Sequence, residues 1–244
     1  MNTSQPLIAL AVFAHPDDIE FTCAGTLALL AERGWDVHYQ TLADGSLGSL
    51  KEGPEAIAQK RWEESQTAAE VLKATPHPPL FLDLEVFYND ASARKVAARI
   101  REIQPNLILT HAVEDYMEDH MNIARLALHA LFSAGIPNYT TDPERPPYDK
   151  PRALYHTLPH GLCRPADRQR VYPEFYLNVD SILELKRNAL ACHQSQKEWL
   201  DQTQGMNAYL DTMTDQAATL GSESGASTHA EGFTRHVHLG LGPE

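Results

Sequence analysis

Histidine and aspartate side chains gather at two places in the sequence. The first is His15-Pro16-Asp17-Asp18, and the second runs from Thr110-His111 to Asp119-His120. Adjacent carboxylates beside an imidazole suit a hard or borderline divalent cation, and catalytic zinc is usually held by nitrogen and oxygen ligands with a position left for water. The two clusters therefore predict a catalytic metal site assembled from distant parts of the chain.

Asp17 and Asp18 also have a purely structural interpretation. Acidic side chains just before a helix cap its first turn and offset its dipole. The His-Pro-Asp-Asp run follows an apolar segment, and a second acidic and histidine-containing cluster follows another one. This repetition favours a metal site over capping alone.

Both clusters follow segments that are expected to be buried strands, at 7–14 and 107–110. Further strands are expected at 35–42, 80–82, 153–158 and 175–179, and helices at 24–33, 55–73, 91–103, 119–132, 181–203 and 206–220. Strands that alternate with helices predict an α/β fold, a Rossmann-like three-layer sandwich with a mostly parallel sheet. Ligands bind at the carboxyl ends of the strands in such sheets, so both clusters should share one site.

The whole chain, 1–244, is expected to form a single domain. The Pro-rich segment 135–151 is expected to be a long loop, and the Gly- and Ser-rich segment 221–230 a flexible one. No Gly-x-Gly-x-x-Gly pattern follows the first strand, which disfavours a dinucleotide-binding site.

The composition excludes several classes of partner. A formal net charge of −13 disfavours nonspecific binding to nucleic acid or to an anionic membrane surface. No apolar run approaches the ~20 residues that a membrane-spanning helix needs. Cys23, Cys163 and Cys192 are too few and too scattered for a disulfide framework. We therefore expect a cytoplasmic protein with neither nucleic acid nor a membrane as its partner.

Short patterns elsewhere in the chain add to the two clusters. They are Ala14-His15-Pro16-Asp17-Asp18-Ile19-Glu20, Arg61 with Glu64, Thr110-His111, Asp115-Tyr116 to Asp119-His120, Lys186 with Ala189 and His193-Gln194-Ser195-Gln196, and Glu231 with Phe233. In their order and spacing these patterns resemble the PIG-L/LmbE-like metal-dependent N-acetylglucosaminyl deacetylase family. The resemblance covers most of the chain.

The resemblance implies a role for individual residues. His15, Asp18 and His120 would be the metal ligands, and Asp17 the general base. The implied cofactor is Zn²⁺, although Fe²⁺ or another first-row cation suits the same ligands. The implied activity is deacetylation of an N-acetyl amino sugar, or of a related small N-acyl conjugate, by a metal-activated water.

The resemblance also implies the partners of this site. Arg61 and His193 would contact the substrate, a small amino sugar or glycoconjugate. Both residues also have a purely structural interpretation: Arg61 would form a salt bridge with Glu64 or another neighbour, and His193 would only complete a polar network. The family also allows a homo-oligomer.

The chain departs from the family at Met117, where the second motif usually has a histidine that stabilises the oxyanion. A thioether donates no hydrogen bond, and losing such a donor commonly costs about 3–4 kcal/mol. His111, Tyr116 and His193 are candidates for the missing donor. Asp119 is retained and would orient one of them or a metal ligand.

Met117 leaves a second function open, that of a metal- and carbohydrate-binding protein with weak or lost hydrolysis. A phosphoester hydrolase that uses the same acidic cluster is a third hypothesis. The absence of a phosphate-binding Gly-Lys-Thr/Ser loop disfavours it.

Overall fold

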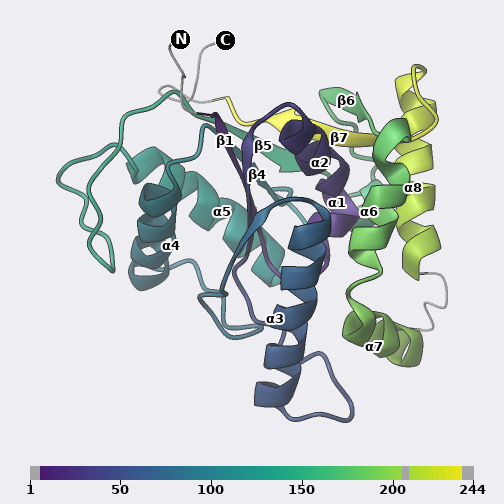
Figure 1. Ribbon diagram of the computed structural model, residues 1–244, viewed down its shortest axis with the longest axis horizontal. Coiled ribbons are helices and arrows are strands. Elements are labelled where there is room, and N and C mark those ends of the chain that lie inside the picture. The colour runs from purple at the N-terminus through teal and green to yellow at the C-terminus, as the bar shows by residue number, and fades with distance from the viewer. Residues whose placement is uncertain (1–5, 205–208, 238–244) are drawn as a thin grey trace.

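The computed structural model describes residues 6–204 and 209–237, which form one seven-stranded sheet with helices around it (Figure 1). The strands are β1 (Ile8–Phe13), β2 (Asp36–Thr41), β3 (Thr75–His77), β4 (Leu107–Thr110), β5 (Ala153–Thr157), β6 (Phe175–Asn178) and β7 (Ala230–Arg235). Their order across the sheet is β3-β2-β1-β4-β5-β7-β6. The first five in this order are parallel, whereas β7 runs antiparallel to β5 and β6. The predicted α/β fold with a mostly parallel sheet is confirmed.

Helices cover both faces of the sheet. They are α1 (Asp18–Thr22), α2 (Ala24–Glu32), α3 (Pro54–Val71), α4 (Asp90–Ile103), α5 (Glu118–Ser133), α6 (Leu183–Leu190), α7 (Gln194–Gln204) and α8 (Tyr209–Ser224), with short 3₁₀ turns η1 (His160–Leu162) and η2 (Asp180–Ile182). Helices α4 and α5 pack on one face, and α1, α2, α3 and α6 on the other (Figure 1). Within the described residues, no helix combines the length and the apolar content that crossing a membrane would need.

Strand β1 lies at the centre of this three-layer arrangement. Leu10 and Val12 pack into the core beneath α4 and α5, whereas Ala11 and Phe13 face the opposite helices. Successive side chains of a strand point to opposite faces, and a strand covered on both sides must be apolar throughout. This explains the unbroken apolar run at the start of the chain.

The third strand differs from the prediction. It was expected at 80–82 but forms at Thr75–His77, where it pairs with β2 at the edge of the sheet. An edge strand tolerates proline because one side of its backbone needs no ladder hydrogen bond, and Pro76 uses this freedom. Phe81 forms an isolated bridge with Ala43 instead.

The single helix expected at 181–203 is divided into α6 and α7, which point in different directions (Figure 1). The carboxylate of Glu64, in α3, accepts hydrogen bonds from the backbone N–H of Ser195 at 2.9 Å and from its hydroxyl at 2.5 Å. This contact caps the first turn of α7 from a distant helix, so a new helix begins there. Local sequence patterns do not contain that information.

The segment 221–230, expected to be a flexible connection, begins inside α8 and ends at the start of β7. A Cβ atom on Gly221 would lie 2.2 Å from the backbone oxygen of Thr228, so this glycine permits close packing between helix and chain. Gly225, with φ of 63°, follows the helix end. The connection is therefore limited to 225–229. Of the helix expected at 206–220, residues 206–208 lie outside the described residues.

The Pro-rich segment 135–151 joins α5 to β5, and the structure assigns neither helix nor strand to it. Arg101, 3% exposed in α4, fixes its first part. The guanidinium donates to the backbone oxygens of Ser133, Ala134, Ile136 and Arg145 at 2.8–3.1 Å. These bonds hold the loop against the α4–α5 layer.

Lys186 and Glu231, which belong to the family patterns, tie three elements together. Glu231 is buried in β7 and accepts hydrogen bonds from the backbone N–H groups of Gly25 at 2.8 Å and Thr26 at 2.7 Å. The Nζ atom of Lys186 lies 2.5 Å from the same carboxylate. The pair therefore joins the first turn of α2 and helix α6 to the sheet.

Candidate active site

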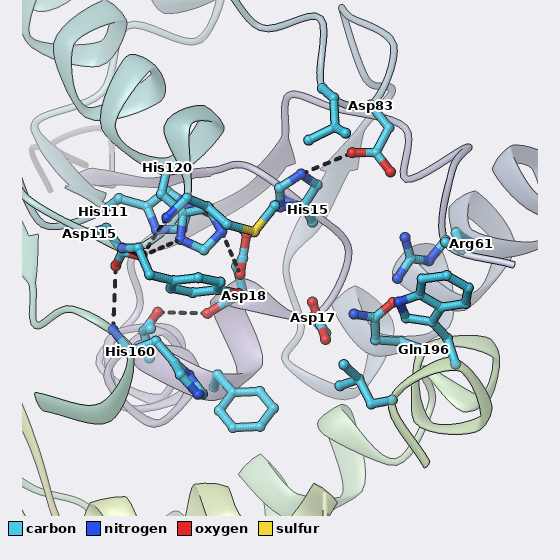
Figure 2. Close-up of a pocket in the computed structure, with 18 of the residues that line it drawn as sticks. His15, Asp17, Asp18, Arg61, Asp83, His111, Asp115, His120, His160 and Gln196 are labelled. Atoms are coloured by element: carbon cyan, nitrogen blue, oxygen red, sulfur yellow. Dashed lines mark hydrogen bonds and ion pairs between the residues drawn. The ribbon is translucent and has the colours of Figure 1, made fainter. Parts of the chain in front are cut away.

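A cavity of about 350 Å³ lies beyond the carboxyl ends of β1 and β4 (Figure 2). These two strands are neighbours, with Val12 opposite Thr110, so the turns that follow them meet at the same edge of the sheet. The cavity is lined by most of the predicted site residues, namely His15, Asp17, Asp18, Arg61, His111, Tyr116 and His120. Between β1 and β4 the order of the strands along the chain reverses direction across the sheet. Ligands of α/β folds usually bind at such a switch point.

Three of these side chains surround one point. His15 Nδ1 lies 3.5 Å from Asp18 Oδ2, and His120 Nε2 lies 3.5 Å from Asp18 Oδ1. One ligand atom from each residue lies within 4.8 Å of the others. His120 Nε2 is buried and has no hydrogen-bond partner among the described residues. A buried nitrogen lone pair beside a carboxylate fits a divalent cation.

Carboxylates also hold the outer nitrogens of the two histidines. Asp115 Oδ1 lies 3.0 Å from His120 Nδ1, which places the proton there and leaves the Nε2 lone pair for a metal. His15 Nε2 lies 3.2 Å from Asp83 Oδ1 and 3.3 Å from Asp119 Oδ2. Carboxylate–histidine pairs of this kind orient metal ligands in many metalloproteins.

Two other groups of side chains are also close enough to hold a cation: His111, Asp115 and His120, and His15, Asp83 and Asp119. In the former, His111 Nε2 already accepts a hydrogen bond from the backbone N–H of Ala14 at 2.9 Å. In the latter, the Asp83 carboxylate accepts the backbone N–H of Leu47 and the Asp119 carboxylate that of Leu84, and both face His15. In the set of His15, Asp18 and His120, fewer of the possible ligand atoms already accept a hydrogen bond from the backbone.

Asp17 and Asp18 have opposite electrostatic environments. Burial opposes ionisation of Asp18, but the charge of His120 and hydrogen bonds from the neighbouring histidines outweigh it and hold the pKa of Asp18 well below its usual range. Burial and the negative charge of Asp18 raise the pKa of Asp17 to about 6. Neighbouring carboxyl groups whose pKa values move apart are typical of acid–base sites.

The backbone explains how adjacent side chains reach different places. Asp17 has φ of 105°, in the left-handed region that a residue with a side chain rarely adopts. Asp18, the first residue of α1, folds back so that its carboxylate accepts the backbone N–H of His15 at 2.7 Å. In Figure 2 the Asp17 carboxylate lies between Asp18 and Arg61.

Arg61 reaches the cavity from α3 through a glycine-containing loop. Its side chain is 2% exposed, and Nη1 donates to the backbone oxygen of Gly45 at 3.0 Å. A Cβ atom on Gly45 or Gly48 would lie 2.3 or 2.9 Å from Nη1, so these glycines make room for the guanidinium. Its Nε and Nη2 atoms have no hydrogen-bond partner in the part of the chain that is described. The salt bridge to Glu64 does not form in this structure, because Glu64 binds Ser195.

His193 lies beneath the cavity. Its side chain is fully buried, and Nε2 lies 3.3 Å from Glu20 Oε2, which also accepts the Tyr39 hydroxyl at 3.2 Å. This position supports Glu20 and the chain around Asp17. His193 is not among the residues that line the cavity.

Two of the three candidates for the missing donor, Tyr116 and His111, line the cavity together with Met117. Met117 and Tyr116 both line the cavity, and the Tyr116 ring lies 5.5 Å from that of His120. Although Tyr116 is 59% exposed, partial desolvation of its hydroxyl and the negative charge of Asp18 raise its pKa, so the hydroxyl stays protonated and is able to donate. Burial and the charge of His120 lower the pKa of His111 to about 4, and its Nε2 atom acts as an acceptor.

Four residues near the site have no role predicted from the sequence: Asp83, Asp115, His160 and Tyr209. Asp115 stands in the same acidic run as His120, and that spacing could have indicated its contact. His160 lines the cavity, and its backbone N–H donates to Asp115 Oδ2 at 3.3 Å. Asp83 and Tyr209 stand alone in the sequence and gave no local signal.

The chain is similar to several known proteins. The chain is 26% identical over 193 residues to diacetylchitobiose deacetylase of Thermococcus kodakarensis. The aligned region covers 77% of the chain and 69% of the relative. It is 29% identical over 208 residues to 4-oxalmesaconate hydratase of Pseudomonas putida, with 81% and 76% covered. The solved structure of N,N'-diacetylchitobiose deacetylase from Pyrococcus horikoshii shares the fold, with a TM-score of 0.79, 20% identity and coverage of 95% and 84%.

The family model of PIG-L, GlcNAc-PI de-N-acetylase, matches residues 10–131. This range contains most of β1 with the His-Pro-Asp-Asp turn that follows it, α3 with Arg61, β4, and α5 as far as Leu131, including His120. The match thus spans half of the chain and every side chain proposed above as a metal ligand. Because this family model matches half of the chain, the chain belongs to the PIG-L family.

Proposed function

We propose that this protein is a metal-dependent hydrolase that removes the acetyl group from an N-acetyl amino sugar or a related small N-acyl conjugate. One observation carries the proposal: His15, Asp18 and His120 converge on one point of the cavity, with Asp17 beside them. The deacetylases among the relatives support the choice of an amide bond.

His15, Asp18 and His120 are the residues that would hold the cation. Two imidazoles and a carboxylate suit Zn²⁺ and also other first-row divalent cations. When bound, such a cation lowers the pKa of a coordinated water and polarises the amide carbonyl. Asp115, Asp83 and Asp119 keep the two histidines in position from outside.

Asp17 acts as the general base in this proposal. Its carboxylate lines the cavity and takes a proton from the attacking water. The same proton then passes to the departing amine, so the C–N bond breaks as the amine becomes neutral. A pKa of about 6 suits both steps near neutral pH, because the group is largely ionised yet still able to carry a proton.

Tyr116 and Arg61 complete the site in this proposal. Tyr116 supplies the hydrogen bond to the developing oxyanion that Met117 does not, since its hydroxyl stays protonated. The Nε and Nη2 groups of Arg61 bind oxygen atoms of the substrate outside the amide.

A second candidate function is the addition of water to a carbon–carbon double bond next to a carboxylate. Two observations favour it: the relative named 4-oxalmesaconate hydratase, and the buried guanidinium of Arg61, which suits a carboxylate. The same cation and the same base would serve this reaction. The hydration of a double bond forms no tetrahedral oxyanion. The donor that Met117 lacks would therefore matter less for the rate of this reaction.

A substrate panel separates the two candidates and the hypothesis of a binding protein. Purified protein loaded with Zn²⁺ or Fe²⁺ is incubated with N-acetylglucosamine, N-acetylglucosaminides and N-acetylated disaccharides, and free amine and acetate are measured. Unsaturated oxo-dicarboxylates are followed by loss of ultraviolet absorbance. Amine and acetate in equal amounts support deacetylation; absorbance loss alone supports hydration; sugar binding with neither product supports the binding protein.

A further inference from the structure

Tyr209 contacts Asp17 from the opposite end of the chain. It is the first residue of α8, and its hydroxyl donates a hydrogen bond to Asp17 Oδ2 at 2.5 Å. This short bond is the only one that the described residues make to the Asp17 carboxylate. No part of the sequence interpretation had given Tyr209 a role.

The phenol is held firmly in this position. Tyr209 is 1% exposed and packs in a small apolar cluster with Leu190 and Met213. Its ring lies 5.2 Å from that of Phe21, in an edge-on arrangement. Burial and the charge of Asp17 raise the pKa of Tyr209 well above its usual value, so the hydroxyl remains a donor. A buried ring with a polar tip normally has a partner, and here that partner is Asp17.

Asp17 needs such a contact more than most carboxylates do. Its backbone has the positive φ described above, which stores strain that the surroundings must hold. The charges of His193 and Arg61 also attract the carboxylate, from beneath and from one side of the cavity. A carboxylate turned toward either group would lie away from the attacking water.

We propose that Tyr209 is a positioning residue for Asp17: its hydroxyl fixes one carboxylate oxygen and so directs the other toward the water to be activated. This inference rests on the proposed function, in which Asp17 is the base. It also gives α8 a part in the active site. The proton that Asp17 takes and returns stays on the cavity side, while Tyr209 keeps its own proton throughout.

Tyr209→Phe tests the proposal, since it removes one oxygen atom and keeps the ring. The expected result is a loss of kcat of about 10- to 100-fold, with KM and bound metal within about twofold of the wild type. Tyr148→Phe is the matched control. Tyr148 is also buried and donates to a backbone oxygen, that of Pro105, in the opposite helical layer. It should lose stability but keep kcat.

A double-mutant cycle with Asp17→Asn decides whether Tyr209 acts through Asp17. In the Asp17→Asn background, Tyr209→Phe should lower the residual kcat by less than twofold. An unchanged kcat in Tyr209→Phe overturns the proposal, and so does an equal loss in both backgrounds. Loss of metal in step with kcat also overturns it, because the residue would then be structural only.

The wild type, Tyr209→Phe, Asp17→Asn and the double variant are also unfolded in urea. This tests the contact between Tyr209 and Asp17 even if no substrate is turned over. Non-additive shifts of the unfolding midpoint support the contact, and additive shifts overturn it. Failure of the proposed function has a different signature: the wild type releases no amine at full metal load. Failure of this inference alone leaves wild-type turnover that Asp17→Asn removes and Tyr209→Phe does not.

Discussion

Asp17 and Asp18 show how much chemistry depends on the direction of a side chain. They are neighbours in the sequence, yet one faces the two histidines and the other faces Tyr209 and Arg61 across the cavity. Residue types at two strand ends were enough to predict this cluster, because parallel strands bring their carboxyl ends together. They were not enough to find Tyr209 or Asp83, whose contacts depend on how α8 and the loop after β3 pack.

Tyr116 carries a direct prediction. Tyr116→Phe should lower kcat by about 100-fold with little change in KM, because one donor to the oxyanion is lost. The measurement is amine release at saturating substrate, with Tyr172→Phe as the control on an exposed tyrosine outside the cavity. Adding Met117→His to Tyr116→Phe should restore part of the loss. A Tyr116→Phe enzyme as fast as the wild type would remove Tyr116 from the mechanism.

Helices and strands were predictable wherever local pattern and tertiary packing agree. The apolar run of β4 and the periodic pattern of α4 appear in the structure at, or within a residue of, the expected bounds. The break before α7 depends on Glu64, and β3 depends on its place at the sheet edge. β7 was not expected as a strand at all, because small and charged residues surround Phe233 and its pairing is long-range.

The Lys186–Glu231 pair gives a prediction about how the elements hold together. Removing one partner of a buried ion pair leaves an uncompensated charge, so Lys186→Met should lower the free energy of unfolding by about 3–5 kcal/mol. The double variant Lys186→Met/Glu231→Gln should lose less than the two single variants combined. Urea unfolding of the four proteins measures this. Additive losses would show that the pair does not couple α6 to β7.

The whole molecule carries a formal net charge of −13, and only a few of its carboxylates belong to the cavity. Those few lie beside histidines at strand ends, where a dication would offset their charge. Composition alone therefore indicated which partners to disfavour, and only the fold shows where the charge is used.

His77 makes part of the pH dependence of stability predictable. It lies on edge strand β3, where Nε2 is 2.8 Å from His38 Nδ1. Burial and the charges of Arg99 and His38 lower the pKa of His77 from 6.5 to about 4. Between these values the unfolded chain binds a proton that the folded chain does not, so stability falls as the pH falls.

His77→Gln should therefore flatten the loss of stability between pH 7 and about 4.5. Urea midpoints of the wild type and the variant at both pH values measure the effect. A variant that loses as much stability as the wild type over this interval would contradict the role given to His77.

In the proposed site Asp17 is the general base and Asp18 a metal ligand, and the two roles can be measured separately. Bound metal and amine release are determined together for the wild type, Asp17→Asn and Asp18→Asn, each after removal of metal with a chelator and reloading with Zn²⁺. Asp17→Asn should keep its metal and lose about 10²- to 10⁴-fold in kcat, because only the base is removed. Asp18→Asn should lose the metal and, with it, the activity. A kcat close to that of the wild type in metal-loaded Asp17→Asn, or metal that Asp17→Asn fails to hold, would contradict the proposed site.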